Sequence, residues 1–569
     1  MSKENMIELR NLSFQYKDQK DGKALEKVNL TISKGEFVLV MGPSGAGKST
    51  MAKCLNGLVP HFNRGEYSGE VIVNGFVVKD TPVSTMAKEI GLVFQDFESQ
   101  LFSTNTKLEI AFGPENFQVP RDEIHSRILE MFDLVDLHGM ENRQPSTLSG
   151  GQKQRLAIGS ILSTYPKIVC MDEPTTDLDP LGKIGIFNIA NKLHAAEDVT
   201  LIIIEHETEE SLNADRLILM QEGKIILDGK PSDVLREVEL MADLGIMPLQ
   251  IPKYFLENFG TSKTELPLMP EEGIAKFKEL GASLDEQQHQ SLIQMDMDRE
   301  KAYGDVLIEV SGLEHIYPNG NKALAGIDFS VRDGEFVALL GHNGSGKTTM
   351  VKHFNGLLMP TAGKVMVKGQ NTKETSIFEV GQHVGYVFQN PDHQIFSDTV
   401  YEEVAFSPKI RGCDQEEIDI RVKEALAAVG MSGTEEEDPF SMTKGERQRI
   451  AVASVLSARP DVIILDEPTT GLDYREQRQM MELVKKLNRN GHTIIMITHT
   501  MWVVSEYAHK VAVIKDGKMM MYGTTREVFS HDEELAKSFL KTPDIVHMSN
   551  LLGKTVLSVD ELKQCTKGV

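Results

Sequence analysis

Two glycine-rich segments carry the residues whose types and spacing point most directly to chemistry. Residues 42–49 and 341–348 both read Gly-x-x-x-x-Gly-Lys-Ser/Thr, and each follows an apolar run that indicates a buried strand. Glycines there let backbone N–H groups approach phosphate oxygens, and a helix that begins behind them adds positive potential. A plain glycine turn is the alternative, but the repetition of the whole pattern argues against it. The residues expected to bind nucleotide in these phosphate-binding loops are Gly42, Pro43, Ser44, Gly45, Ala46, Gly47, Lys48, Ser49, Thr50, Gly341, His342, Asn343, Gly344, Ser345, Gly346, Lys347, Thr348 and Thr349.

Acidic pairs end a second set of apolar runs. "KIVCMD" ends at Asp172 and "DVIILD" ends at Asp466, and a glutamate, Glu173 or Glu467, follows directly. A carboxylate at a strand end beside a phosphate-binding loop is placed to hold a metal ion. The carboxylate after it can polarise a water for attack on the outer phosphate, although a second metal carboxylate without a base role is the alternative. The Mg²⁺ ligands expected from this pattern are Ser49, Asp172, Thr348 and Asp466.

A histidine closes a third apolar run in each half. His206 stands in "TLIIIEHE" and His499 stands in "TIIMITHT". A histidine at a strand end is commonly structural, but its recurrence beside the other motifs favours contact with the outer phosphate. The catalytic residues expected from these patterns are Glu173, Glu467, His206 and His499.

The motifs recur at a steady distance, so the chain contains an internal repeat. Lys48 and Lys347 lie 299 residues apart, and Asp172 and Asp466 lie 294 apart. Two related domains in tandem explain this spacing. The predicted boundaries are 5–232 for the first domain, 233–304 for an acidic connector, 305–530 for the second domain and 531–569 for a C-terminal appendage. The connector segment 252–272 loosely echoes 543–561, which indicates that each half ends in its own appendage; two unrelated amphipathic segments are the alternative.

Composition narrows the class of protein. The 569 residues are 40% hydrophobic and 25% charged, as in ordinary globular domains, and this length favours two or more domains. No apolar run approaches the length of a membrane span, and the N-terminus lacks an apolar signal core, so we expect a cytosolic protein. The four widely separated cysteines indicate neither disulfides nor a metal cluster. A net charge of −24 argues against general nucleic-acid binding.

The segment "LSGGQKQR" at 148–155 resembles the signature of ATP-binding-cassette ATPases, and the resemblance covers nearly all of both halves. It implies an α/β fold with two tandem P-loop NTPase domains, each with a RecA-like core and a helical signature subdomain. It also implies ATP and Mg²⁺ as cofactors, and head-to-tail pairing of the two cassettes, so that each ATP lies between one phosphate-binding loop and the opposite signature. The signature residues are Ser149, Gly150, Gly151, Gln152, Thr443, Lys444, Gly445 and Glu446.

Two further pairs of residues take roles from this resemblance. Gln95 and Gln389 match the Q-loop glutamine, which contacts Mg²⁺ and lies near the membrane partner. Tyr16 and Tyr317 match the aromatic residue that stacks on adenine, although a tyrosine at a strand end is also a common packing residue.

The second signature is altered, because Thr443-Lys444-Gly445 stands where the first half has Ser149-Gly150-Gly151. Thr443 keeps a hydroxyl donor, whereas Lys444 replaces a residue that permits close backbone approach. Lys444 then keeps the backbone away from the phosphate, pairs with the phosphate itself or points to solvent. Under head-to-tail pairing this signature serves the site of Lys48, and we predict that this site hydrolyses ATP more slowly.

The segments after the Q-loop glutamines, 94–116 and 388–410, align without a gap and share nine of 23 residues. They resemble cassettes of energy-coupling-factor and cobalt-type importers, in the branch with fused ATPases that is often linked to thiamine-precursor uptake. The resemblance implies two partners, a transmembrane coupling subunit and a small membrane subunit that captures a vitamin, a vitamin precursor or a transition-metal ion. It therefore implies peripheral association with the cytoplasmic face of the cell membrane, with no nucleic acid bound.

A soluble twin-cassette ATPase that acts on the ribosome is the main alternative function. Such proteins also join two cassettes by a linker, but that linker meets rRNA. The connector here has 14 acidic and 7 basic residues, and rRNA would repel it. A DNA-repair or chromosome-type cassette is disfavoured as well, because no long heptad insertion and no zinc cysteines interrupt either half.

Overall fold

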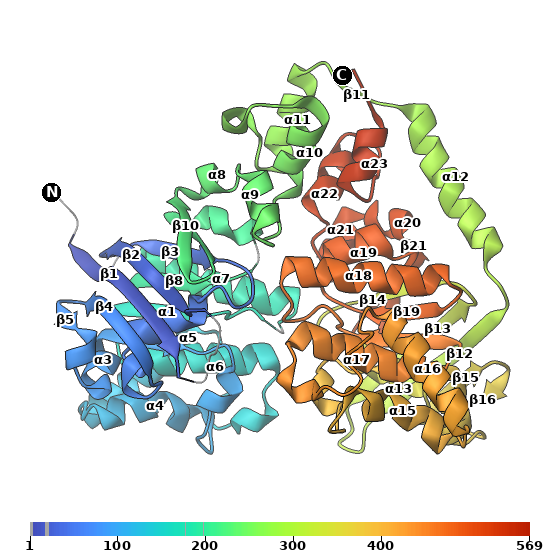
Figure 1. Ribbon diagram of the computed structural model, residues 1–569, viewed down its shortest axis with the longest axis horizontal. Coiled ribbons are helices and arrows are strands. Elements are labelled where there is room, and N and C mark those ends of the chain that lie inside the picture. Colours follow the sequence, from blue (N-terminus) through green and yellow to red (C-terminus); the bar gives the residue numbers. More distant parts are fainter. Residues whose placement is uncertain (1–3, 18–21, 177, 197–198, 207, 569) are drawn as a thin grey trace. The chain divides into compact units, whose positions relative to one another are not determined.

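The computed structural model describes residues 4–17, 22–176, 178–196, 199–206 and 208–568, and the chain forms two compact units (Figure 1). The first unit comprises Met1–Leu256 and Thr261–Leu268, and the second comprises Glu257–Gly260 and Met269–Val569. Each unit contains one half of the repeat. The boundaries predicted at 232 and 305 remain predictions, but the connector is divided between the two units.

The first unit contains two sheets. A six-stranded sheet has the order β10-β9-β3-β8-β7-β6, in which β10 is antiparallel to β9 and the other neighbours are parallel. A four-stranded antiparallel sheet has the order β2-β1-β4-β5. The strands are β1 (Asn5–Tyr16), β2 (Leu25–Ser33), β3 (Phe37–Met41), β4 (Gly65–Val73), β5 (Phe76–Val77), β6 (Ile90–Val93), β7 (Ile168–Asp172), β8 (Thr200–Ile204), β9 (Arg216–Gln221) and β10 (Lys224–Gly229).

The parallel strands bring the predicted chemistry to one edge of the sheet. Every residue of β3, β7 and β8 is buried, which explains their unbroken apolar sequences. The phosphate-binding loop, Asp172 and His206 all follow the carboxyl ends of these three strands, where ligands of open parallel sheets bind.

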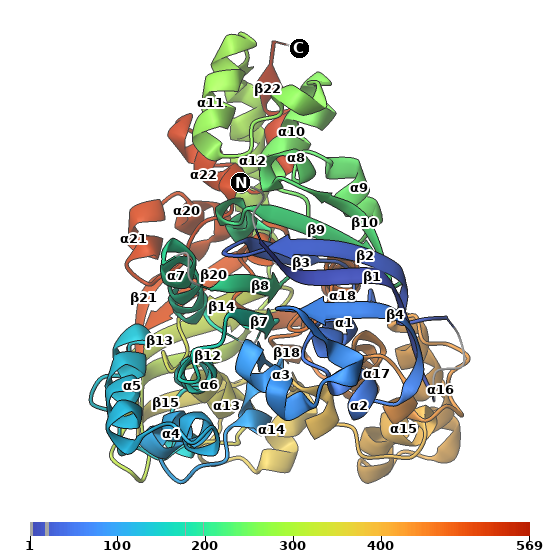
Figure 2. The same cartoon turned by 90° about the vertical axis from the view of Figure 1, so that its left-hand side faces the viewer.

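Helices of the first unit cover the sheet and form a separate group after the Q-loop. Helices α4, α5 and α6 pack on one another and lie together in Figure 2, as expected for the helical subdomain. The helices are α1 (Lys48–Leu55), α2 (Leu58–His61), α3 (Val83–Glu89), α4 (Thr106–Asn116), α5 (Arg121–Leu134), α6 (Gly150–Leu162), α7 (Pro180–Ala195), α8 (Pro231–Val234), α9 (Val238–Asp243) and α10 (Gln250–Phe259), the last of which extends into residues of the second unit.

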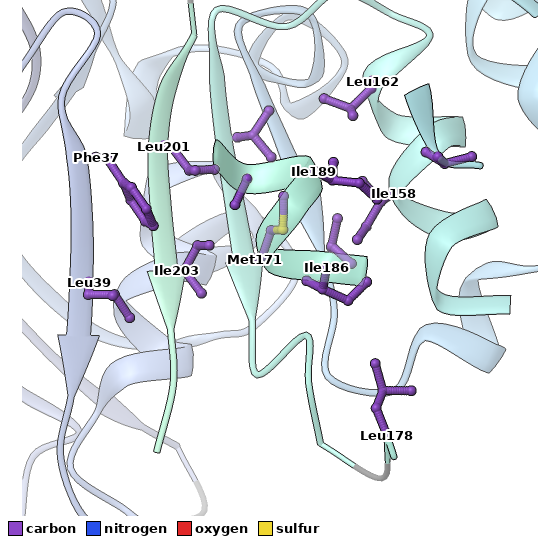
Figure 3. Close-up of a cluster of buried hydrophobic side chains, with 14 of the residues drawn as sticks. Phe37, Leu39, Ile158, Leu162, Met171, Leu178, Ile186, Ile189, Leu201 and Ile203 are labelled. Atoms are coloured by element: carbon purple, nitrogen blue, oxygen red, sulfur yellow. The ribbon is translucent and has the colours of Figure 1, made fainter. Parts of the chain in front are cut away.

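The core of the first unit joins the large sheet to these helices. Its buried cluster also includes Leu244, Ile246, Leu249 and Leu268, so the first part of the connector is part of this unit's core. Figure 3 labels members of the cluster from the strands, from helices α6 and α7 and from the loop before α7: Phe37, Leu39, Ile158, Leu162, Met171, Leu178, Ile186, Ile189, Leu201 and Ile203.

The second unit repeats this architecture strand for strand. Its six-stranded sheet has the order β17-β18-β19-β14-β20-β21, and its four-stranded sheet has the order β13-β12-β15-β16. The strands are β12 (Val306–Ile316), β13 (Lys322–Arg332), β14 (Phe336–Leu340), β15 (Ala362–Val367), β16 (Gln370–Asn371), β17 (Val384–Val387), β18 (Val462–Asp466), β19 (Thr493–Ile497), β20 (Lys510–Lys515) and β21 (Lys518–Thr524). The helices are α13 (Lys347–Phe354), α14 (Ile377–His383), α15 (Val400–Ile410), α16 (Gln415–Ala428), α17 (Lys444–Leu456), α18 (Tyr474–Arg489), α19 (Met501–Tyr507), α20 (Thr525–Phe529) and α21 (Asp532–Ala536).

The later part of the connector meets the C-terminal tail within the second unit. Strand β11 (Ser283–Leu284) of the connector pairs antiparallel with β22 (Thr566–Lys567) of the C-terminal tail. Helix α11 (Pro270–Glu279) packs against α22 (Asp544–Leu551), and Lys563 of α23 (Val559–Gln564) forms an ion pair with Glu257 of α10. The interpretation that each half carries its own appendage stays a prediction.

Helix α12 (Glu286–Ala302) leads from these appendages to the second half, and its contacts explain why it belongs to the second unit. Buried Arg526 donates to Asp296 of α12 and to Glu561, and Lys510 forms an ion pair with Glu300. Among the described residues, none of the helices combines the length and apolar character that crossing a bilayer requires.

Candidate active sites

The glycine-rich loop of the first half has the shape of a phosphate cradle. Helix α1 begins at Lys48 behind Gly47, which has a left-handed φ of 95°. A Cβ on Gly47 would lie 2.3 Å from the carbonyl oxygen of Ala24, and one on Gly42 would lie 2.3 Å from that of Met220. Only glycine fits these positions, so the backbone N–H groups are accessible to an anion.

The lysines of both loops are buried and fold over the loop carbonyls. Lys48 Nζ donates to the carbonyl oxygens of Gly42 at 2.7 Å and Pro43 at 3.0 Å. Lys347 Nζ donates to the carbonyl oxygen of Gly341 at 2.6 Å in the same way. Each ammonium group therefore lies inside a loop of glycine N–H donors, as phosphate recognition requires.

The predicted metal ligands of the first half come together. Ser49 Oγ donates to Asp172 Oδ1 at 3.1 Å, and burial raises the pKa of this aspartate above its ordinary value. A hydroxyl and a carboxylate oxygen this close suit a hard cation such as Mg²⁺, so the residues fit the predicted ion.

The aspartate of the second half has a different partner. Tyr386 of β17 donates its phenol O–H to Asp466 Oδ2 at 2.5 Å, whereas the first half has Leu92 at this position of the repeat. Burial raises the pKa of Asp466, and burial together with the charge of Asp466 raises the pKa of Tyr386. Aligning the two halves could have revealed this difference, because a hydroxyl replaces a methyl-bearing side chain next to the metal position.

The predicted base of the first half is held by three side chains. Glu173 has a left-handed φ of 49°, which turns its buried side chain toward the site. Its carboxylate accepts hydrogen bonds from Gln95 Nε2 at 2.6 Å and Thr176 Oγ1 at 3.3 Å, and it lies 2.7 Å from His206 Nε2. Burial alone would raise the pKa of Glu173, but the hydrogen bond and charge of His206, together with Lys48, lower it. This group is therefore ionised near neutral pH, as a base must be.

The predicted base of the second half makes other hydrogen bonds. Glu467 has the same φ of 49°, and its carboxylate lies 3.0 Å from His499 Nε2. Its other oxygen accepts the backbone N–H of His499 at 3.3 Å. His499 Nε2 also lies 3.2 Å from Asn343 Oδ1 of the phosphate-binding loop. In this half the glutamate contacts its histidine twice, and Gln389 is exposed.

The altered signature keeps the backbone geometry of the intact one. Ser149 caps α6 in a capping box with Gln152, and Thr443 caps α17 in a capping box with Glu446. The cap residues have nearly equal dihedral angles, φ −67° and ψ 161° against φ −64° and ψ 160°. A lysine at the first helical position therefore does not displace the helix end.

The side chain of Lys444 folds back over the loop that follows Glu467. Its Nζ lies only 2.3 Å from the point where a Cβ on Gly471 would stand. At the position of the first half that matches Lys444, no atom of the described residues lies within 4 Å of a Cβ built on Gly150. The side chain thus lies against this loop, and whether Lys444 keeps the backbone away from phosphate or contacts phosphate itself stays a prediction.

The remaining predicted residues lie beside the loops. The hydroxyl of half-buried Tyr16 lies 3.1 Å from Thr50 Oγ1, and that of Tyr317 lies 3.0 Å from Thr349 Oγ1. Each tyrosine thus contacts the first turn of the helix that follows the phosphate-binding loop of its own half. Stacking on adenine remains a prediction.

Comparison with known proteins gives concordant results. The family model described as ABC transporter matches residues 25–176 and 324–470. An ABC transporter ATP-binding protein of Caldanaerobacter subterraneus subsp. tengcongensis is 65% identical over 561 residues, covering 99% of each chain. One of Methanosarcina acetivorans is 39% identical over 577 residues, covering 99% of this chain and 94% of the relative. The solved structure of cbiO1 from Clostridium perfringens, described as part of the ABC transporter complex cbiONQ, is 35% identical and covers 43% of this chain and 99% of its own, with a TM-score of 0.39.

Proposed function

Because this chain belongs to the ATP-binding proteins of ABC transporters, we propose that it is the ATPase subunit of an importer of the energy-coupling-factor type. The two matched domains confirm the predicted α/β fold of tandem P-loop ATPase domains, and the chain is an ATPase. The finer proposal concerns the partners. In this proposal, membrane subunits bind the transported substrate, which is a vitamin, a vitamin precursor or a transition-metal ion. The ATPase contacts those subunits from the cytoplasmic face.

One observation carries this proposal: each half exposes a pair of phenylalanine rings just after the Q-loop. Phe102 and Phe112 are 61% and 45% exposed, with ring centroids 4.5 Å apart in an edge-to-face arrangement. Phe396 and Phe406 are 59% and 42% exposed, at 4.7 Å. Rings of this size exposed at the same place twice indicate a docking surface for protein.

Buried carboxylates hold these rings at the surface. Glu109 is 2% exposed and accepts the backbone N–H groups of Phe102 and Ser103 at 3.2 and 2.8 Å. Glu403 does the same for Phe396 and Ser397, at 3.1 Å each. Because a buried charge is expensive unless it is bonded, this recurring anchor supports a surface built for binding. The occupant we propose is a short amphipathic helix of the transmembrane coupling subunit, with its apolar side against the rings.

The residues of each half have separate roles in ATP hydrolysis. Lys48 and the glycine N–H groups hold the phosphates, Glu173 accepts a proton from the attacking water, and His206 orients Glu173. The second half uses Lys347, Glu467 and His499 in these roles. The residues that would hold Mg²⁺ are Ser49, Gln95, Asp172, Thr348, Gln389 and Asp466. An ion held there would neutralise charge on the phosphate oxygens.

We further propose that the two sites are composite and unequal. In head-to-tail pairing, Thr443, Lys444 and Gly445 complete the site of Lys48, and the intact signature at Ser149 completes the site of Lys347. The signature helix binds phosphate through the exposed backbone N–H groups at its start, and Lys444 adds a side chain there. The site of Lys48 is therefore the slower one.

Co-fractionation with membranes tests the proposal. The double variant Phe102→Ala with Phe396→Ala should reduce the membrane-bound share of the chain by roughly tenfold or more, because two aromatic anchors that docking buries contribute ~1–2 kcal/mol each. Phe62→Ala is the matched control, since Phe62 is 71% exposed but lies outside these segments. Equal membrane binding by the double variant, or sedimentation of the wild-type chain with ribosomes at moderate salt, would overturn the proposal.

A further inference from the structure

The residue before each catalytic histidine differs in kind between the halves. Glu205 precedes His206, and Thr498 precedes His499. Both are buried, Glu205 at 2% exposure and Thr498 at 0%. An extra buried carboxylate within the first active site requires polar partners, because burying an unbonded charge is very costly.

Glu205 uses its two oxygens to join two segments. Its Oε1 accepts the hydroxyl of Thr175 at 2.6 Å and the backbone N–H of Thr175 at 3.2 Å. Its Oε2 accepts the backbone N–H of His206 at 3.2 Å. One side chain thereby fixes the loop two residues beyond Glu173 to the strand end that carries His206.

In the second half, the equivalent residues form different hydrogen bonds. There Glu467 itself accepts the backbone N–H of His499, and Thr498 Oγ1 accepts the N–H of Thr500 at 3.1 Å. Thr469, the counterpart of Thr175, is buried, and within the described part of the chain its hydroxyl has no hydrogen-bond partner. In this half the catalytic glutamate therefore accepts the histidine amide, which Glu205 accepts in the first half.

From this exchange we infer that Glu205 is a positioning residue for the first site. By accepting the amide of His206, it leaves both oxygens of Glu173 for side chains, with Oε1 beside His206 Nε2 and Oε2 accepting from Gln95. By bonding Thr175 twice, it fixes the segment that follows Glu173. The base of the first site is thereby held in register with the Q-loop glutamine.

The test isolates the first site by placing all variants in a Glu467→Gln chain. Hydrolysis of radiolabelled ATP is followed in single turnover with protein in excess, which resolves slow rates, and ATP affinity is measured separately by equilibrium binding. Glu205→Thr, which copies the second half, should slow hydrolysis about tenfold, because a loosened base loses part of the acid–base contribution, while affinity changes less than about twofold. Glu205→Gln keeps one acceptor and should recover part of the rate.

Matched variants separate positioning from general stability. Thr175→Val removes one of the bonds without removing a charge and should slow hydrolysis about threefold, which covers the case in which Glu205→Thr does not fold. Thr498→Val in a Glu173→Gln chain should leave the single-turnover rate of the second site unchanged. A Glu205→Thr rate within twofold of its parent, or an equal loss of rate and affinity, would refute the inference.

Discussion

The two candidate active sites have the same backbone arrangement and differ in the hydrogen bonds of the glutamate predicted to act as the base. Glu173 contacts the side chains of Gln95 and His206, whereas Glu467 contacts the ring and the backbone amide of His499. The difference lies in Glu205 and Tyr386, which lie outside the motifs, and in Lys444 within the altered signature. Identical motifs therefore do not make identical sites, because the neighbours decide which bonds the motif residues form.

The two halves also differ in where the specialised residues point. In the first half, Glu205 acts on the predicted base and its loop through its bonds to Thr175 and His206. In the second half, Tyr386 donates to Asp466 at the predicted metal position, and Lys444 lies over the loop that follows Glu467. The following variants test this division, beginning with the largest expected effect.

Removing each base in turn is the strongest test of unequal sites. In the assembled importer, Glu467→Gln should abolish most turnover, whereas Glu173→Gln should leave a measurable remainder, since loss of a general base costs roughly 10²–10⁴-fold at its own site. Steady-state ATP hydrolysis at saturating ATP measures both. Equal losses in the two variants would contradict the asymmetry.

Restoring the signature should speed the slower site. Lys444→Gly removes the side chain that lies over Gly471 and leaves the Thr443 cap in place, so turnover in a Glu467→Gln chain should rise about fivefold. The reciprocal variant Gly150→Lys, in a Glu173→Gln chain, should slow the second site. If Lys444→Gly instead lowered both turnover and ATP affinity, Lys444 would be a phosphate ligand.

The sequence predicts the features that the two halves share, but it does not explain the residues in which the halves differ. The loops, the strand-end carboxylates and the histidines follow from spacing alone, because parallel strands end at one edge of a sheet. The role of Glu205 does not follow from the sequence, since its partner Thr175 lies 30 residues away and meets it only in the folded chain. The position of the Lys444 side chain was open for a similar reason, because Gly471 approaches it only through packing.

The metal position of the second half should depend on Tyr386. Tyr386→Phe removes the phenol that donates to Asp466, so this buried carboxylate loses a hydrogen bond worth ~1–2 kcal/mol. We expect the Mg²⁺ concentration needed for half-maximal turnover to change severalfold in a Glu173→Gln chain, with little change in the apparent ATP affinity measured without Mg²⁺. Leu92→Met is the matched control at the same place of the first half. An unchanged Mg²⁺ requirement would show that Tyr386 only packs.

The smallest expected effect concerns acid stability and a histidine pair present only in the second half. His353 of α13 lies 3.1 Å from His315, whereas the first half has Cys54 and Phe14 at these positions. Burial lowers the pKa of His353 from 6.5 to about 4, so below pH 6.5 the unfolded chain binds a proton that the folded chain does not. Stability present at pH 7 is therefore lost as the pH falls from about 6.5 toward 4.

His353→Cys should remove this contribution. In the wild-type chain it amounts to about 1 kcal/mol between pH 7 and pH 5, which lowers the melting temperature of the second half by ~2–4 °C. The measurement is the difference in melting temperature between the two pH values, because the cavity left by the smaller side chain lowers both values alike. Cys54→Ala, at the same position of the first half, should leave that difference unchanged. An equal acid shift in His353→Cys and wild type would assign the sensitivity to other groups, and the two halves would then respond to acid for the same reasons.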